Sequence, residues 1–103
     1  MADQRSIEVI RNGSRPSTRG SEKTFTGSVI VDSLFAATEH TQATGGLVSF
    51  QPGARTAWHT HPSGQTLIVT SGIGWVQQAG GPRQHVQPGD VKRRYEAIAI
   101  TKC

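Results

Sequence analysis

The chain of 103 residues has 34% apolar and 17% charged residues and a formal net charge of +4. A chain of this length forms one domain with a modest core. No apolar run approaches the roughly 18 residues of a membrane span, and the one cysteine excludes a disulfide framework. The positive residues are scattered and not interleaved with aromatic ones, so we expect no nucleic-acid partner and no membrane partner. Because the start of the chain has no signal-peptide core, we expect a cytoplasmic location.

Residues 1–23 are predicted to form an N-terminal arm that precedes a domain of residues 24–103. Residues 11–23 are rich in Ser, Arg, Gly, Pro and Thr and follow no periodic pattern, which is typical of a loop. Within the arm, residues 6–10 are predicted to form a short strand that pairs with another subunit.

From residue 24 onward, apolar and polar residues alternate. Phe25, Gly27, Val29 and Val31 fall on one face, which is the period of a half-buried strand. Residues 32–37 are predicted to form a single helical turn capped by Asp32. Short strands separated by turns that contain glycine, together with 12 glycines and 5 prolines, predict an all-β sandwich or barrel. The further strands are predicted over residues 46–51, 66–71, 75–78 and 84–87.

Two histidines and a glutamine are candidate metal ligands. His59 and His61 are two residues apart, so in an extended strand both imidazoles project from one face. The Pro62-Ser63-Gly64 turn then allows the chain to reverse and to bring Gln65 to the same place. Neutral imidazole nitrogens and a carboxamide oxygen suit Mn, Fe, Ni, Co or Zn. The segment is therefore a candidate site for a divalent transition metal.

The spacing from Gly53 to Gly72, Gly-x5-His-x-His-x3-Gln-x6-Gly, resembles the first motif of the cupin superfamily, with Gln65 where Glu is usual. The run GARTAWHTHPSGQTLIVTSGIGWVQQAGG and the later QPGDV turn are similar to small single-domain bacterial cupins that include manganese-dependent hydroxynitrile lyases. This likeness covers about residues 24–91. It implies a jelly-roll barrel (a double-stranded β-helix) with a metal inside, near one mouth.

The resemblance also implies roles for individual residues. It makes His59, His61 and Gln65 the metal ligands, with manganese as the expected ion and Fe, Ni, Co or Zn as alternatives. Gly46 and Val48, on the strand before the motif, are then expected to line the cavity of a small-molecule substrate.

One part of the family pattern is missing. In these cupins a second motif supplies a fourth ligand, a histidine, often with a histidine of the reaction chemistry close behind. Here residues 89–96 read GDVKRRYE, and no histidine follows His85. No catalytic residue is therefore assigned, and His85 is kept as an alternative source of the missing ligand. The cluster Lys92-Arg93-Arg94 is interpreted as a solvated edge that discourages aggregation.

The missing motif also affects the expected architecture. Residues 97–100 resemble the last strand of the family barrel, as if about twenty intervening residues were lost. We therefore expect a barrel that is truncated or incomplete toward its C-terminus. Open strand edges and a thin core favour a homodimer in which a second subunit covers the exposed backbone and apolar surface.

Three functions fit these features. The first is a metal-dependent enzyme of the hydroxynitrile-lyase type, which cleaves and forms cyanohydrins with the metal as a Lewis acid. The second is a cupin dioxygenase with iron, because two imidazoles and one oxygen ligand resemble the facial triad of non-haem iron enzymes. The third is a non-enzymatic or degenerate cupin that binds a small molecule or a metal, since a fold does not fix a function.

Overall fold

The computed structural model describes residues 6–61, 63–94 and 98–103. These residues form ten strands and no helix, which confirms the all-β prediction. Among them, no helix is long and apolar enough to span a membrane. The strands are β1 (Ser17–Arg19), β2 (Phe25–Thr26), β3 (Val29–Phe35), β4 (Gly45–Phe50), β5 (Arg55–Thr56), β6 (Gln65–Ile68), β7 (Gly74–Gln78), β8 (Arg83–Val86), β9 (Val91–Arg94) and β10 (Ile98–Lys102).

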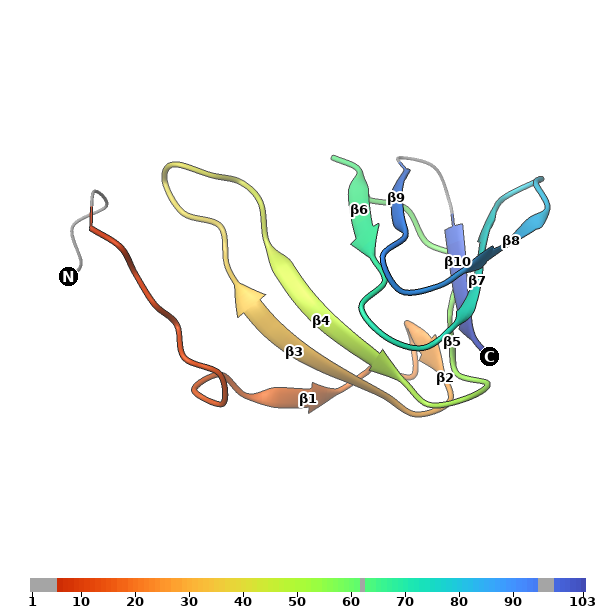
Figure 1. Cartoon of the computed structure of the whole chain (residues 1–103), viewed down its shortest axis with the longest axis horizontal. Coiled ribbons are helices and arrows are strands. Elements are labelled where there is room, and N and C mark those ends of the chain that lie inside the picture. Colours follow the sequence, from red (N-terminus) through yellow and green to blue (C-terminus); the bar gives the residue numbers. More distant parts are fainter. Residues whose placement is uncertain (1–5, 62, 95–97) are drawn as a thin grey trace.

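The strands form three antiparallel sheets; in Figure 1, β3 and β4 lie on one side of the domain and β7, β8 and β10 gather on the other. One sheet has the order β1-β3-β4, a second the order β2-β5-β10-β7-β8, and β6 and β9 form the third. Segments far apart in the sequence are therefore neighbours, since β10 lies between β5 and β7. In the separate two-stranded sheet, β6 pairs with the later strand β9, which places Gln65 opposite Arg94.

The fully buried apolar core is small. Among the described residues, only Val29, Ala54, Val76 and Val86 are apolar and buried. They come from β3, the start of β5, β7 and β8, so they mark where the sheets approach each other. A core of this size agrees with the low apolar content of the sequence.

Gly27 permits the close approach between the turn after β2 and the start of β5. Its φ is +86°, a conformation that residues with a side chain rarely adopt. A Cβ at this position would also lie 2.9 Å from the Ala54 Cα atom. The alternating segment predicted as one strand is therefore divided at Gly27 into β2 and β3.

Two predictions of local structure were wrong. The loop predicted over residues 11–23 contains β1, which pairs antiparallel with β3 through Thr18 and Val31. Residues 6–10 form no strand within the chain, and their pairing with another subunit stays a prediction. Residues 32–35 are extended within β3 and do not form a helical turn, because Asp32 pairs with Leu47 and continues the ladder with β4. Pairing with β4 satisfies the backbone groups of this segment, which outweighs the capping tendency of Asp32.

The buried hydroxyl of Thr56 connects β5 to β10 by a hydrogen bond, and removal of this hydrogen bond tests the fold. The backbone N–H of Ile100 donates to Thr56 Oγ1 at 2.9 Å, and Thr56 is 7% exposed. Thr56→Val keeps the shape but leaves the Ile100 N–H without its acceptor, so we expect a loss of about 1–3 kcal/mol in the free energy of unfolding. Urea unfolding measures this loss. Thr56→Ser, which retains the hydroxyl, is expected to lose less; a valine variant as stable as the parent would contradict the assigned role.

The β3–β4 hairpin exposes apolar side chains that a second copy of the chain could bury. Homodimer formation therefore stays a prediction. Ile30, Phe35 and Leu47 are each more than one-third exposed. Burial of such surface by a second copy is favourable at roughly 25 cal/mol per Å². Light scattering at micromolar concentration is expected to give about twice the chain mass, and Phe35→Asp is expected to shift the population toward the monomer. A parent protein that stays monomeric would contradict this prediction.

Candidate metal centre

The two histidines lie in the connection between β5 and β6. The backbone N–H of Ala57 donates to the Thr24 carbonyl at 2.7 Å, which fixes the start of this connection against β2. The N–H of Gly64 donates to the His61 carbonyl at 2.8 Å, and Gly64 has a φ of +83°. This glycine allows the tight reversal after which β6 begins directly at Gln65.

A backbone hydrogen bond orients the ring of His59. Its Nδ1 lies 2.7 Å from the Ala57 carbonyl oxygen. Because a carbonyl only accepts, Nδ1 carries the proton and Nε2 presents its lone pair. A histidine that binds a metal commonly donates its other ring N–H in this way.

The interior side of the site contains two polar atoms without partners. His61 Nε2 and Gln65 Oε1 are buried, and neither has a hydrogen-bond partner among the described residues. Buried polar atoms are rarely left in this state, since each costs about 1–3 kcal/mol. The His59 and His61 rings lie with their centroids 4.9 Å apart at an interplanar angle of 83°. The two imidazole rings are therefore in contact, and Gln65 lines the same cavity. Their role as metal ligands stays a prediction.

The protonation of His61 suits a ligand role. Burial lowers the pKa of His61 below the ordinary histidine value of 6.5, and the neighbouring His59 lowers it further. Both effects favour the neutral imidazole, which is the form that binds metals.

The donor set fits a first-row divalent metal. In the described part of the chain, no three side chains of the His, Cys, Asp or Glu type gather into a metal-binding group, so Gln65 is the available third ligand. Two imidazole nitrogens and one amide oxygen suit Mn, Fe, Co, Ni or Zn, although a neutral amide binds more weakly than a carboxylate. The two buried atoms without partners have the chemistry that such an ion requires.

The candidate ligands open onto the cavity inside the domain, which has a volume of about 480 Å³. Gly46 and Val48, predicted to line a substrate cavity, are among its lining residues. So is Lys92, which the sequence interpretation placed on a solvated edge with its neighbours. That interpretation was wrong for Lys92, which is half-buried, whereas Arg93 is exposed. The register of β9 against β6 determines this difference, and no local sequence pattern reveals it.

His85 lies away from the candidate ligands. It is exposed on β8, and its ring contacts Trp75 with a centroid distance of 5.2 Å. Arg83 lies over the same indole, 4.9 Å from the ring centroid. His85 does not belong to the cavity lining, so the geometry does not support it as the replacement ligand.

The described residues form an all-β domain in which the two histidines line the cavity. A family model described as a cupin domain matches residues 46–92. A cupin-like protein of Thermotoga maritima is 34% identical; the match has a TM-score of 0.68 and covers 93% of this chain and 81% of that one. The chain therefore belongs to the cupin superfamily.

A relative with a named activity is the (R)-mandelonitrile lyase of Granulicella tundricola. The two sequences are 53% identical over 85 residues, which is 82% of this chain and 65% of the lyase. The chain therefore spans less than two-thirds of the length of this relative.

The lowered pKa of His61 can be measured directly. In metal-free protein, we expect NMR titration to give a His61 pKa below 6.5, and we expect His59→Ala to raise it because the charge of His59 no longer opposes protonation. The unfolded chain then binds a proton more readily than the folded one. Stability should therefore decrease as the pH falls from about 6.5 toward the lower folded value. A His61 pKa at or above 6.5 would contradict the burial that the structure assigns to this ring.

Proposed function

We propose that the chain is a metal-binding cupin of the hydroxynitrile-lyase type, which cleaves cyanohydrins into a carbonyl compound and hydrogen cyanide and also runs the reverse reaction. The observation that carries the proposal is the pair of buried atoms without partners, His61 Nε2 and Gln65 Oε1, beside the oriented ring of His59. The similarity to a mandelonitrile lyase supports the choice of reaction. Manganese is the proposed ion.

Each of the three ligands has a distinct basis. His59 would bind through Nε2, because Nδ1 donates to the Ala57 carbonyl and so holds the ring in place. His61 would bind through the buried Nε2, which its lowered pKa keeps unprotonated. Gln65 would bind through Oε1, and its position at the first residue of β6 fixes its backbone. When bound, the ion supplies Lewis acidity toward an oxygen of the substrate.

Cyanohydrin cleavage needs one proton transfer and one bond cleavage. The hydroxyl proton leaves to a base, the carbon–oxygen double bond forms, and the carbon–carbon bond breaks with its electron pair on cyanide, which takes up a proton. The apolar side chains around the cavity, such as Phe25, Leu67 and Val76, suit the organic part of a cyanohydrin and exclude water. Gly46 and Val48 are proposed to contact the substrate from β4.

The metal ligands are tested by metal content. After purification without chelator and addition of Mn²⁺, the parent protein is expected to retain about one ion per chain by elemental analysis. His59→Ala and His61→Ala are expected to abolish retention, and Gln65→Ala to weaken it, because each removes one of only three donors. Full occupancy in both histidine variants would overturn the site assignment.

Two other histidines provide the controls for this experiment. His40 is exposed beside Glu39, so His40→Ala is expected to leave the metal content unchanged. His85→Ala is likewise expected to have no effect, because His85 lies outside the cavity lining. A protein that retains no metal would instead favour the non-enzymatic cupin, and one that retains iron and consumes oxygen would favour the dioxygenase.

The expected rate of cyanohydrin cleavage is low. Among the described residues, the cavity contains no imidazole other than the two assigned to the metal. A positioned general base typically contributes about 10²- to 10⁴-fold in rate. Cyanide release from mandelonitrile with added Mn²⁺ is therefore expected to be slower by about this factor than that of the Granulicella tundricola lyase. A rate equal to that of the lyase would contradict the inference that the reaction here lacks an efficient imidazole base.

A further inference from the structure

Lys92 brings a positive charge into the interior of the barrel. In the β6–β9 pair, Lys92 lies opposite Leu67, and Gln65 lies two residues before Leu67. Residues two apart on a strand, and residues directly opposite on an antiparallel neighbour, share one face. Gln65, Leu67 and Lys92 are therefore on the interior face, while Arg93, opposite Thr66, is on the exposed face.

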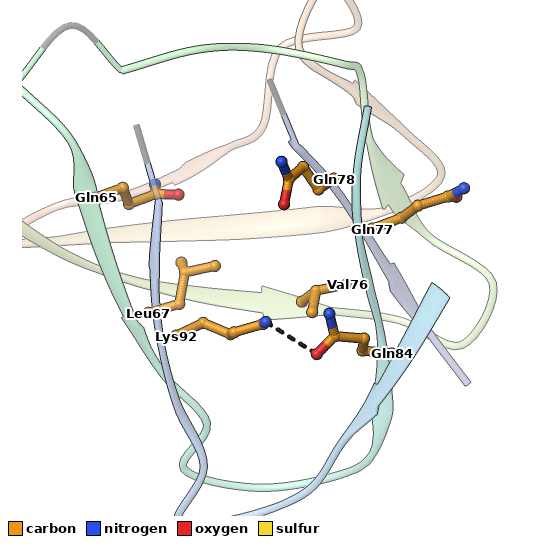
Figure 2. A pocket seen from close by; sticks show the side chains of 7 residues that line it. All are labelled: Gln65, Leu67, Val76, Gln77, Gln78, Gln84 and Lys92. Carbon is orange, nitrogen blue, oxygen red and sulfur yellow. Dashed lines mark hydrogen bonds between the residues drawn. The ribbon is translucent and has the colours of Figure 1, made fainter. Parts of the chain in front are cut away.

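The Lys92 side chain extends toward β8, where it meets the exposed side chain of Gln84. Its Nζ donates to Gln84 Oε1 at 3.0 Å, and Figure 2 shows the two side chains directed at each other across a recess. Besides Lys92 and Gln84, this recess is lined by Gln65, Leu67, Val76, Gln77 and Gln78. The recess and the main cavity share Gln65, Leu67, Val76 and Lys92, so the recess is a polar extension of the cavity that contains the candidate metal ligands.

The charge of Lys92 has no counter-charge in the described part of the chain. None of the described carboxylates lies within 4.0 Å of Nζ. Asp90 also lines the cavity, but its Oδ2 accepts from the Gln87 N–H at 3.0 Å. The other cavity-lining ammonium, that of Lys102, lies against Gly72. An ammonium whose identified partner is the neutral amide of an exposed side chain can gain a charge-assisted hydrogen bond from an anion.

From these contacts we infer that Lys92 and Gln84 form a subsite for the carboxylate of a small organic acid, in the recess that shares Gln65 with the main cavity. Lys92 Nζ supplies the charge, and Gln84 Nε2 is a second donor. Leu67 and Val76 contact the apolar part of the ligand. Two residues along an extended strand span about 7 Å, so a ligand held at Lys92 needs only the length of a small molecule to reach Gln65. The inference names a ligand class for the cavity of the proposed function, but the charge-based subsite itself does not need a metal.

The test compares mandelate with its neutral isostere mandelamide on metal-free protein. Chelator-treated protein is used because a hydroxy acid can bind a metal directly and so conceal the contribution of Lys92. NMR titration with each compound gives its dissociation constant. Mandelate is expected to bind about tenfold more tightly than mandelamide, and this preference should weaken with added salt.

The variants separate binding by charge from a structural role of the Lys92–Gln84 contact. Lys92→Met is expected to weaken mandelate binding about tenfold and to leave mandelamide within about twofold, while Lys92→Arg retains most of the preference. Arg93→Met removes the same charge from the exposed face of the same strand and is expected to change neither affinity. This matched pair keeps net charge constant between the variants.

Three results would overturn the inference. The first is a mandelate affinity no higher than that of mandelamide. The second is a loss of affinity in Lys92→Met that is as large for mandelamide as for mandelate. The third is a loss of mandelate affinity in Arg93→Met as large as that in Lys92→Met. A failure of the proposed metal function would show in the metal analysis, as an absence of retained Mn²⁺. Because the binding comparison is made without metal, that failure leaves its result intact.

Discussion

The site depends on one constraint, the cost of leaving His61 Nε2 and Gln65 Oε1 buried without partners. Each such atom costs the folded chain about 1–3 kcal/mol, in a domain whose described apolar core consists of four small side chains. The backbone that holds them is well fixed. The Gly64 N–H donates to the His61 carbonyl, and β6 begins at Gln65 in register with Arg94 of β9. A ligand that satisfies both atoms would recover part of this cost, so the same feature connects stability and function.

Much of the fold follows from local sequence signals. Glycine-containing turns and short alternating segments predicted an all-β domain, and the strands predicted over residues 46–51, 75–78 and 84–87 lie within one residue of β4, β7 and β8. The errors have a common origin in pairing between distant segments. Pairing with β4 keeps Asp32 extended where its capping tendency predicted a helical turn. Likewise, pairing with β3 forms the strand Ser17–Arg19 within the segment predicted to be a loop. Local patterns carry no information about such partners.

The candidate metal ligands were predictable because they are local in the sequence, whereas the position of Lys92 was not. His59, His61 and Gln65 lie close together in the sequence, so the spacing of one strand and one turn was enough to group them. The interior position of Lys92 follows from the register between β6 and β9, which are more than twenty residues apart in the chain. The sequence places Lys92 beside two arginines and so suggests a solvated edge, yet Lys92 and Arg93 face opposite sides of the strand.

The central claim is that two imidazoles of this chain bind one divalent metal ion. The most direct measurement is pulsed electron paramagnetic resonance of the Mn²⁺-loaded protein with ¹⁵N-labelled histidine. The account predicts hyperfine couplings from the ring nitrogens of two histidines. A spectrum of Mn²⁺ without histidine nitrogen couplings, identical to that of the ion in buffer, would contradict the account.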